Sequence, residues 1–300
     1  MKVGYVALVG RPNVGKSTLL NHILGQKVAI ISDKPQTTRM SILGIKTTEK
    51  GQIIFVDNPG IHRPLHKLNK RMMNFVYSAL ETADLICLLI DATLRFGHGD
   101  QFVIDTLKTI TTPKFLLINK VDILKKEKIL LLIDRYKDLL EFKEIIPISA
   151  LKGTNVDVLE DLIIANLPEA EKIYGDEEIS DQSLRFLLSE IIREKVLNHV
   201  REELPFVTAV YIDRMEDRSP RGSSEDARPR KYVAASIFVE KDTHRRIIVG
   251  RQGRMIRTIG TEARKEMEEI LEARVFLDLK VKVKEKWRDS PDVLDLIEGQ

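Results

Sequence analysis

The chain has 300 residues, of which 43% are hydrophobic and 31% charged, and its formal net charge is +3. This length suffices for two domains, and the composition is typical of globular proteins, not of disordered ones. The single cysteine, Cys87, excludes a disulfide framework and favours a cytoplasmic protein, which we expect to be monomeric. Because the N-terminal residues lead directly into a predicted strand, we expect no signal peptide. Because no apolar run reaches the roughly 18–20 residues of a membrane span, any membrane contact is expected to be peripheral.

Short β-branched runs alternate with helical patterns up to about residue 170. The predicted strands are residues 3–9, 42–47, 53–57, 85–91, 115–119 and 145–149, and the predicted helices lie near 17–24, 67–81, 100–108, 127–139 and 155–165. This alternation is typical of an α/β domain whose mostly parallel sheet is covered on both faces. Ligands of such sheets bind outside the carboxyl ends of the strands, which is where the motifs of this half fall.

The first motif lies between a predicted strand and a predicted helix. Residues 10–17 read GRPNVGKS and match G-x-x-x-x-G-K-[ST] in full. Such a loop turns its backbone N–H groups toward phosphates, and the helix that follows adds the positive end of its dipole. Lys16 is expected to reach the β- and γ-phosphates, and the Ser17 hydroxyl to bind Mg²⁺. The predicted phosphate-binding residues are Gly10, Asn13, Val14, Gly15, Lys16, Ser17 and Thr18.

Two polar segments have the character of a phosphate-dependent switch. DNPG, residues 57–60, ends a strand, so that Asp57 is expected to hold Mg²⁺ and the Gly60 N–H to sense the γ-phosphate. KPQTTR, residues 34–39, carries two threonines; Thr38 is the predicted metal ligand, and the alternative for Thr37 and Thr38 is a strand-entry turn. A loop that contacts the metal only while the γ-phosphate is present makes a two-state switch.

Two further strand ends predict a guanine pocket. NKVD, residues 119–122, lies at the end of the strand predicted at 115–119, and SALK, residues 149–152, lies at the end of the strand predicted at 145–149. A carboxylate at Asp122 accepts hydrogen bonds from guanine N1–H and the 2-amino group, and adenine lacks both donors. A site built on such bonds rejects the wrong base by roughly 10⁴–10⁵. The predicted base-binding residues are Asn119, Lys120, Asp122, Ser149, Ala150 and Leu151; the Ala150 N–H is expected to meet O6 and Asn119 to bridge base and phosphate loop.

Beyond an interruption with proline, glycine and acidic residues, the order of elements changes. We assign residues 173–182 to a linker. A helix is then predicted at 183–199, strands near 206–213, 232–240 and 275–286, and two short helices around residues 250–253. A loop is predicted between residues 217 and 229.

The segment around residues 250–253 is a G-x-x-G loop with basic surroundings. From residue 228 to residue 257 there are nine basic and two acidic side chains, although residues 173–300 carry 24 basic and 26 acidic ones. The basicity is therefore a local patch, which favours binding of a nucleic acid. The residues predicted to contact a nucleic acid, which is RNA if the KH resemblance given below holds, are Arg245, Arg246, Ile248, Gly250, Arg251, Gln252, Gly253, Arg254, Met255 and Arg257.

The last predicted strand has lysines at every second position. Lys280, Lys282, Lys284 and Lys286 would share one face, with Val281, Val283 and Trp287 opposite. Two interpretations stay open for this face: contact with RNA, or an edge strand guarded by lysines.

The set GRPNVGKS, PQTTR, DNPG, NKVD and SALKG resembles the translation-factor-related GTPases and, among them, the Era family, in which DNPG usually reads DTPG. The resemblance covers the whole chain. It implies an α/β P-loop GTPase domain with a mostly parallel sheet at residues 1–172, the linker at 173–182, and an α+β type II KH domain at 183–300. In KH domains the G-x-x-G loop clamps a single strand of about four nucleotides.

The resemblance also implies a function. Its cofactors would be GTP or GDP and Mg²⁺, with K⁺ supported by an asparagine in the position of Asn13. Lys16, Thr38, Gly60 and Asn13 would act in hydrolysis. Ile61 stands where Ras-like proteins have a water-orienting glutamine, which implies slow, partner-dependent turnover. The implied partners are the 3′ end of 16S ribosomal RNA and the 30S subunit during its assembly, with GTP favouring the RNA-competent state, and the implied membrane contact is peripheral and with the inner membrane.

Two alternatives belong to other classes. A metabolic P-loop enzyme that transfers phosphate to a small molecule would use ATP and show an acceptor pocket, and it leaves the guanine motifs and the arginine-rich loop unexplained. A membrane-linked signalling GTPase would use its basic faces to bind anionic lipid, and this role is compatible with RNA binding.

Overall fold

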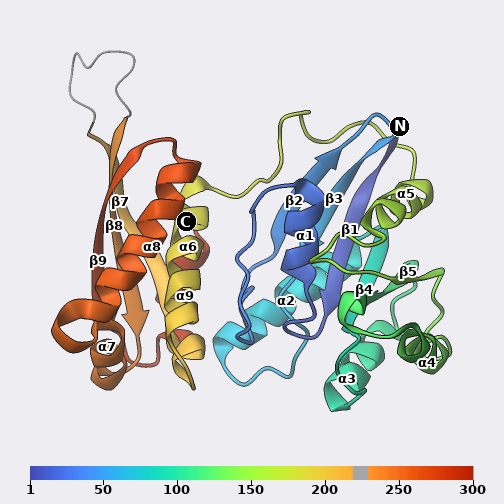
Figure 1. The fold of residues 1–300 in the computed structure, drawn as a ribbon, viewed down its shortest axis with the longest axis horizontal. Helices are drawn as coiled ribbons and strands as arrows, with labels where there is room; N and C mark the ends of the chain where they lie inside the picture. The colour runs from blue at the N-terminus through green and yellow to red at the C-terminus, as the bar shows by residue number, and fades with distance from the viewer. Residues whose placement is uncertain (219–228, 300) are drawn as a thin grey trace. The chain divides into compact units, whose positions relative to one another are not determined.

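The computed structural model describes residues 1–218 and 229–299 (Figure 1). The chain forms two compact units, one of residues 1–65 and 69–181 and the other of residues 66–68 and 182–300. Most of the loop predicted between residues 217 and 229 lies outside the described residues. No helix in the described ranges is long and apolar enough to cross a membrane.

The first unit alternates strands and helices close to the predicted positions. Its strands are β1 (Lys2–Gly10), β2 (Ile42–Thr47), β3 (Gly51–Asp57), β4 (Leu85–Asp91), β5 (Lys114–Asn119) and β6 (Glu144–Pro147). Its helices are α1 (Lys16–Leu24), α2 (Lys67–Thr82), α3 (His98–Leu107), α4 (Lys126–Tyr136) and α5 (Val156–Asn166). The strand order is β2-β3-β1-β4-β5-β6, and only the β2–β3 pair is antiparallel. The mostly parallel α/β sheet is thus confirmed.

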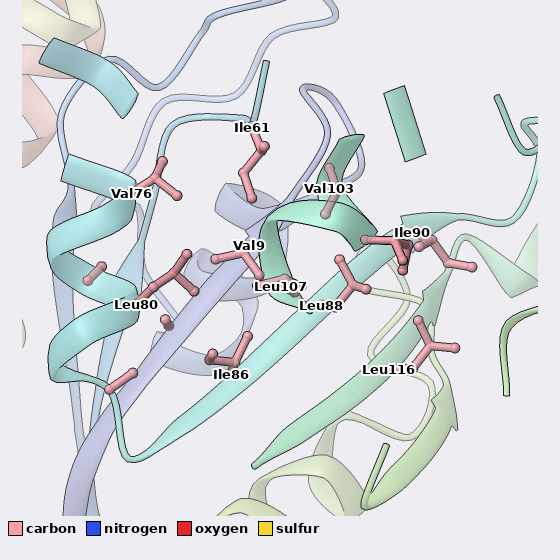
Figure 2. Close-up of a cluster of buried hydrophobic side chains, with 14 of the residues drawn as sticks. Val9, Ile61, Val76, Leu80, Ile86, Leu88, Ile90, Val103, Leu107 and Leu116 are labelled. Carbon is pink, nitrogen blue, oxygen red and sulfur yellow. The ribbon is translucent and has the colours of Figure 1, made fainter. Parts of the chain in front are cut away.

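Helices cover this sheet on both faces because its central strands are apolar along their whole length. On one face, side chains of α2 and α3 join those of the central strands in a buried cluster that includes Val76, Leu80, Val103 and Leu107 (Figure 2). α1 and α5 contact β1 and β3 without entering this cluster. The motifs follow the carboxyl ends of β1, β3, β5 and β6, and these strands are packed between the helices.

The segment predicted to be a linker is tied to the first unit. Its backbone has neither helix nor strand, but Ile173 N–H and Tyr174 N–H donate to the Gln52 side chain at 2.9 and 3.0 Å. Farther on, the Ile45 N–H donates to the Ile179 carbonyl at 2.8 Å. These hydrogen bonds explain why the first unit extends to residue 181.

The second unit is a three-stranded sheet with helices. Its elements are α6 (Leu184–His199), β7 (Ala209–Asp217), β8 (Arg230–Val239), α7 (Asp242–Val249), α8 (Arg254–Ile270), β9 (Arg274–Val283) and α9 (Pro291–Glu298), with a 3₁₀ turn at Trp287–Asp289. The order is β7-β8-β9; β7 is antiparallel and β9 parallel to β8. One sheet face packs on α6, α7 and α8 in a second core. An α+β arrangement is confirmed.

Three expectations for this unit are wrong. The second helix after the glycine-rich loop is not short, since α8 has 17 residues. The last strand ends at Val283, so Lys284 and Lys286 are not part of it, and Lys286 adopts a left-handed conformation with φ 49°. Trp287 is not on a strand face but fully buried, with its indole N–H donating to the Val207 carbonyl at 2.8 Å. The helix α9 was not predicted.

Candidate nucleotide site and glycine-rich loop

The phosphate-binding loop turns sharply between β1 and α1. Gly15 has φ 102° and Gly10 has φ 148°, in the region that favours glycine. A Cβ on Gly15 would lie 2.3 Å from the Asn119 Nδ2, and one on Gly10 would lie 2.4 Å from the Leu89 carbonyl oxygen. Only glycine fits at both places, so these two residues allow the tight turn from β1 into α1.

Lys16 is the buried cation of this loop. Its Nζ donates to the Arg11 carbonyl at 3.1 Å. Burial lowers the pKa of Lys16, and the nearby Asp57 carboxylate opposes this shift. An anionic ligand in the loop would therefore favour the charged ammonium, as a phosphate does.

Three oxygen-bearing side chains meet next to Lys16. The Ser17 hydroxyl donates to Asp57 Oδ2 at 2.5 Å and lies 3.0 Å from Thr38 Oγ1. Asp57 Oδ1 is buried, and within the described part of the chain it has no hydrogen-bond partner. Burial raises the pKa of Asp57 to about 6, against the effects of Lys16 and Ser17. Oxygen ligands and an unsatisfied carboxylate fit a hard cation such as Mg²⁺, which would stabilise the ionised carboxylate.

The two threonines of the 34–39 segment differ in their contacts. Thr37 Oγ1 donates to the Lys34 carbonyl at 2.6 Å, whereas Thr38 Oγ1 lies beside Ser17. Thr38 is therefore the threonine that joins the oxygen cluster.

The strand end at residues 57–60 brings the backbone close to the phosphate-binding loop. A Cβ on Gly60 would lie 2.5 Å from the Pro12 nitrogen, and the Ile61 N–H donates to the Gly10 carbonyl at 3.0 Å. The Ile61 side chain enters the buried cluster of the first unit (Figure 2). An isoleucine side chain has no polar group that could orient a water molecule, and this one is also buried in the core.

Asn58, which replaces the usual threonine, is fully buried and bonded. Its amide donates to the Val56 and Leu8 carbonyls at 3.0 and 3.3 Å, and its Oδ1 accepts from the Ser41 hydroxyl at 2.8 Å. The substitution is thus satisfied within the fold and links the strand end to the segment that follows Thr38.

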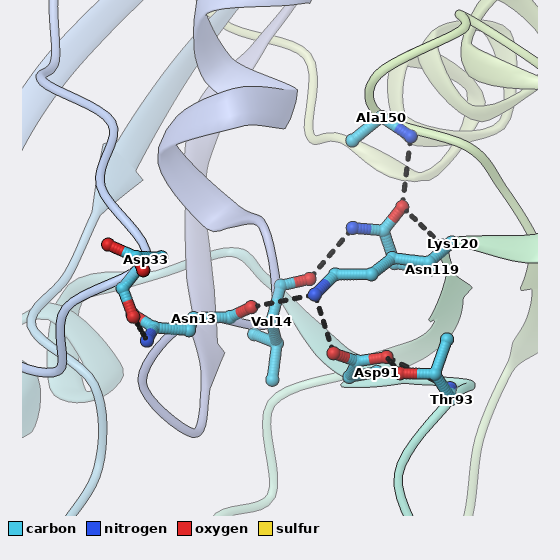
Figure 3. A network of polar contacts seen from close by, with 8 residues as sticks. All are labelled: Asn13, Val14, Asp33, Asp91, Thr93, Asn119, Lys120 and Ala150. Atoms are coloured by element: carbon cyan, nitrogen blue, oxygen red, sulfur yellow. Dashed lines mark hydrogen bonds and ion pairs between the residues drawn. The ribbon is translucent and has the colours of Figure 1, made fainter.

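On the base side, Asn119 connects two strand ends to the phosphate-binding loop. Its Nδ2 donates to the Val14 carbonyl at 2.7 Å, and its Oδ1 accepts from the N–H groups of Lys120 and Ala150 at 2.8 and 2.9 Å (Figure 3). The bridge to the phosphate loop is as expected. In this structure the Ala150 N–H meets Asn119, and its contact with guanine O6 stays a prediction.

Asp91, at the end of β4, is a site residue that the sequence analysis missed. Its Oδ2 lies 2.5 Å from Lys120 Nζ, which also donates to the Asn13 carbonyl at 3.1 Å (Figure 3). Its Oδ1 accepts from Thr93 N–H and hydroxyl at 2.9 and 2.6 Å. Burial alone would raise the pKa of Asp91, but the hydrogen bonds from Lys120 and Thr93 outweigh it and lower this pKa. A carboxylate thus fixes the side chain of Lys120, one of the predicted base-binding residues.

The remaining base-side residues lie on neighbouring turns. Asp122 is exposed in the 3₁₀ turn Val121–Ile123, and among the described residues its carboxylate has no hydrogen-bond partner. Ser149 is buried, and its Oγ accepts from the Lys152 N–H at 3.1 Å. Leu151 is exposed.

A cavity of about 420 Å³ lies between the phosphate-binding loop and the switch segments. Its lining includes Pro12, Asn13, Gly15, Lys16, Ser17, Thr18, Gln36, Thr37, Thr38, Gly60 and Lys120. The predicted residues of the phosphate and metal site are thus largely brought together. Asp122 and residues 149–151 are not in this lining. Asn119 links Ala150 to the phosphate-binding loop.

In the second unit, the glycine-rich loop joins α7 to α8. Gly250, Gln252 and Gly253 have φ 71°, 51° and 73°. A Cβ on Gly250 would lie 2.7 Å from the Met255 Cβ, whereas one on Gly253 would meet open space. The loop backbone around Gly253 is therefore open to a ligand.

The arginines around the loop fall into two groups. Arg245 and Arg246 pair with Asp242 at 2.8 and 2.9 Å. Arg251, Arg254 and Arg257 are exposed, and in the described ranges their guanidinium groups have no partner. Ile248, expected at the ligand surface, is instead fully buried in the core of the unit, and its neighbour Ile247 is exposed.

Comparisons with known proteins agree with both halves. A family model described as "50S ribosome-binding GTPase" matches residues 5–120, and a KH domain model matches residues 225–288. The chain is 44% identical over 298 residues to the GTPase Era of Leuconostoc citreum (strain KM20), with 99% of this chain and 96% of the relative covered.

Two solved structures are similar over their whole length. One is Era in complex with MgGDPNP and nucleotides 1506–1542 of 16S ribosomal RNA, with a TM-score of 0.92, 42% identity, and 99% and 98% of the two chains covered. The other is a point variant of Aquifex aeolicus Era bound to GDP·AlF₄⁻, with a TM-score of 0.92, 42% identity and 99% of both chains covered. The chain therefore belongs to the Era family of GTPases.

Proposed function

We propose that the chain is a GTP-binding, slowly hydrolysing switch that binds the single-stranded 3′ end of 16S ribosomal RNA during assembly of the 30S subunit. The observation that carries this proposal is the meeting of Ser17, Thr38 and Asp57 in the first unit, together with a G-x-x-G loop in the second unit. Around this loop, Arg251, Arg254 and Arg257 have no partner in the described ranges. A similar protein has been solved with MgGDPNP and nucleotides 1506–1542 of 16S ribosomal RNA.

In the phosphate site, the N–H groups of the loop and Lys16 bind the phosphates, and Ser17, Thr38 and Asp57 hold Mg²⁺. When bound, the metal neutralises charge on the phosphate oxygens. Support comes from the convergence of the Ser17, Thr38 and Asp57 oxygens and from the unpartnered Asp57 Oδ1. The Gly60 N–H reports the γ-phosphate, and Asn13 supports a K⁺ ion.

In the guanine site, Asp122 accepts from the base, Lys120 packs its stem on the ring, and Asn119, Ser149, Ala150 and Leu151 complete the pocket. The carboxylate of Asp122 is exposed and lacks a protein partner in the described residues, as a group that awaits a ligand should. Hydrolysis is slow without a partner because the buried Ile61 offers no group to orient water.

The RNA contact lies in the KH half. Arg251, Arg254 and Arg257 neutralise phosphates that approach Gly253, and Arg245, Arg246, Gly250, Gln252 and Met255 complete the clamp, with Ile248 anchoring it from the core. The proposed division is a GTPase domain at residues 1–172, a linker at 173–182 and a KH domain at 183–300. We further propose a monomeric, cytoplasmic protein with peripheral contact to anionic membrane.

The KH assignment is tested with an RNA of the sequence of nucleotides 1506–1542 of 16S ribosomal RNA. Gly253→Asp adds a negative charge where a side chain meets no atom, and Asp tolerates the left-handed backbone. The matched control, Gly253→Asn, has the same size and no charge. We expect Gly253→Asp to weaken RNA binding at least roughly tenfold, as loss of charge-assisted contacts does. We expect Gly253→Asn to bind the RNA much more tightly than Gly253→Asp does. Equal affinity of wild type and Gly253→Asp would contradict the assignment.

A further inference from the structure

The face of the second-unit sheet that does not pack on α6, α7 and α8 carries aromatic and basic side chains. In β8 and β9 alternate residues, such as Val233, Ala235 and Val275, enter the core. The residues between them point to the other face. They include Arg230 and Tyr232 on β8 and Arg274, Phe276, Lys280 and Lys282 on β9. The G-x-x-G loop joins two helices of the packed face, so this outer face is a separate surface.

Two aromatic rings on the outer face are stacked in advance of any ligand. Tyr232 and Phe276 are direct neighbours across β8 and β9, with ring centroids 5.8 Å apart and planes 18° apart. The Arg218 guanidinium carbon lies 4.0 Å from the centroid of the Tyr232 ring, and the Tyr232 hydroxyl donates to Asp278 Oδ2 at 3.2 Å. Phe276 is 66% exposed. The ring of Phe276 is therefore exposed to solvent and is fixed by stacking on Tyr232.

The charges around this ring are arranged with the cations outermost. Lys280 pairs with Asp278 at 3.7 Å, and their side chains are 65% and 33% exposed. The same order holds for Lys282 with Asp213 and for Arg214 with Glu216, where the cation is the more exposed partner. Arg274 is exposed and has no ion-pair partner in the described ranges. A ligand that approaches this face meets positive charge first, although carboxylates lie beneath.

A single exposed ring flanked by cations at strand spacing matches single-stranded nucleic acid. Each base offers a flat face to stack on an aromatic ring, and each linkage offers a phosphate to Lys or Arg. A stable protein interface would instead require a contiguous apolar patch, and around Phe276 the outer face is charged. An anionic lipid surface would offer phosphates to the lysines but no flat base to stack on Phe276.

We infer that the outer face of the β7-β8-β9 sheet binds a second segment of single-stranded RNA, with a base stacked on Phe276 and phosphates at Lys280 and Lys282. The inference rests on the proposed RNA-binding function and adds to it a second contact, outside the G-x-x-G loop. It also decides between the two open interpretations of the lysine face in favour of RNA for Lys280 and Lys282.

The test uses the full chain and a fluorescent, U-rich single-stranded RNA in an anisotropy titration. Phe276→Ala removes the stacking ring, and Phe276→Trp retains one; because Phe276 is mostly exposed, neither change disturbs the core. Each is made with wild-type Gly253 and with Gly253→Asp. We expect Phe276→Ala to weaken binding at least about fivefold, the lower end for one stacked base, and to abolish the binding left in Gly253→Asp, whereas Phe276→Trp restores it.

The lysines are tested by salt dependence. Lys280→Glu with Lys282→Glu should lower the slope of log affinity against log salt by about 1.4, since each phosphate contact on a single strand contributes about 0.7. The matched control makes the same charge change at Lys125 and Lys126, on the first unit, and should leave the slope unchanged.

The outcomes separate this inference from the function on which it rests. If Gly253→Asp abolishes binding and Phe276→Ala has no effect beside wild-type Gly253, the second contact does not exist and the KH assignment stands. If Phe276→Ala changes only the sedimentation of the protein, the face is a protein interface and the inference is wrong. If no variant and no wild-type protein binds RNA, the proposed function itself is overturned.

Discussion

Asp91→Asn is expected to accelerate the release of guanine nucleotide. The carboxylate lies 2.5 Å from Lys120 Nζ and its side chain is only 6% exposed. Lys120 is otherwise held by the Asn13 carbonyl at 3.1 Å. Asparagine preserves the shape of the side chain, so the change removes the charge and little else. Lys120 would then lose the anion that fixes it beside the base.

The size of the effect follows from the environment of the pair. A hydrogen bond to a charged group contributes about 1.5–3 kcal/mol, whereas an exposed ion pair contributes only about 0–1 kcal/mol. Asp91 is nearly buried but Lys120 is 35% exposed, so we take about 1.5 kcal/mol. This corresponds to roughly a tenfold loss of affinity, which should appear mainly as a faster dissociation rate.

Stopped-flow release of a fluorescent GDP analogue measures this rate. The matched control is Asp105→Asn. The Asp105 carboxylate also pairs with a lysine, Lys108, but the Asp105 side chain is 51% exposed, so this change should alter the release rate less than about twofold. In a Lys120→Met background Asp91→Asn should have little further effect. An unchanged release rate in Asp91→Asn, or full additivity with Lys120→Met, would refute the role of Asp91.

The pH dependence of the same experiment has a defined sign. Because the pKa of Asp91 is lowered in the folded protein, its stabilising charge is fully present above the ordinary Asp pKa of about 3.9 and is lost only as the pH falls through the folded value. The ratio of the Asp91→Asn and wild-type rates should therefore be the same at about pH 6 and about pH 8. A ratio that shrinks between these two values would contradict this.

Three further predictions concern the base pocket, the metal ligand and the glycine-rich loop. Asp122→Asn should weaken GTP binding roughly 100-fold or more in a competition assay, because two hydrogen bonds to a charged acceptor are altered; an effect below tenfold would contradict the guanine pocket. Thr38→Ala should raise the Mg²⁺ concentration needed for GTP-analogue binding by roughly tenfold, and Thr37→Ala should not; the reverse order would refute the choice of Thr38. Gly253→Ala should destabilise the second unit by roughly 1–2 kcal/mol, the strain of a left-handed backbone. Gly250→Ala should destabilise it by more, because a Cβ at residue 250 would also clash with Met255. The buried Trp287, the one tryptophan of the chain, reports this unfolding, and equal shifts for the two glycines would contradict the clash.

Local pattern was enough to predict the nucleotide loop and its supporting strands. Gly15 and Gly10 are dictated by a turn whose geometry excludes a Cβ, and the apolar runs of β4 and β5 reflect burial on both faces. Thr38 was also chosen over Thr37 from sequence, and its contact with Ser17 supports that choice.

Residues whose role depends on distant parts of the chain could not be predicted in this way. Asp91 ends a strand without belonging to a recognised motif, and it meets Lys120 only because β4 and β5 lie side by side. Trp287 is buried against Val207, 80 residues away, so alternation with the preceding lysines wrongly placed it on a strand. Ile248 was likewise misplaced at the ligand surface, because its burial depends on the packing of α7 against the sheet.

The most direct test of the switch is the affinity of the full chain for an RNA of the sequence of nucleotides 1506–1542 of 16S ribosomal RNA in the presence of Mg²⁺ with either GDPNP or GDP. If the guanine site controls the KH half, GDPNP should tighten binding by roughly 5- to 150-fold, the usual range of coupling between two sites, and Thr38→Ala should remove the difference. Equal RNA affinity with GDPNP and GDP in the wild-type protein would contradict the switch.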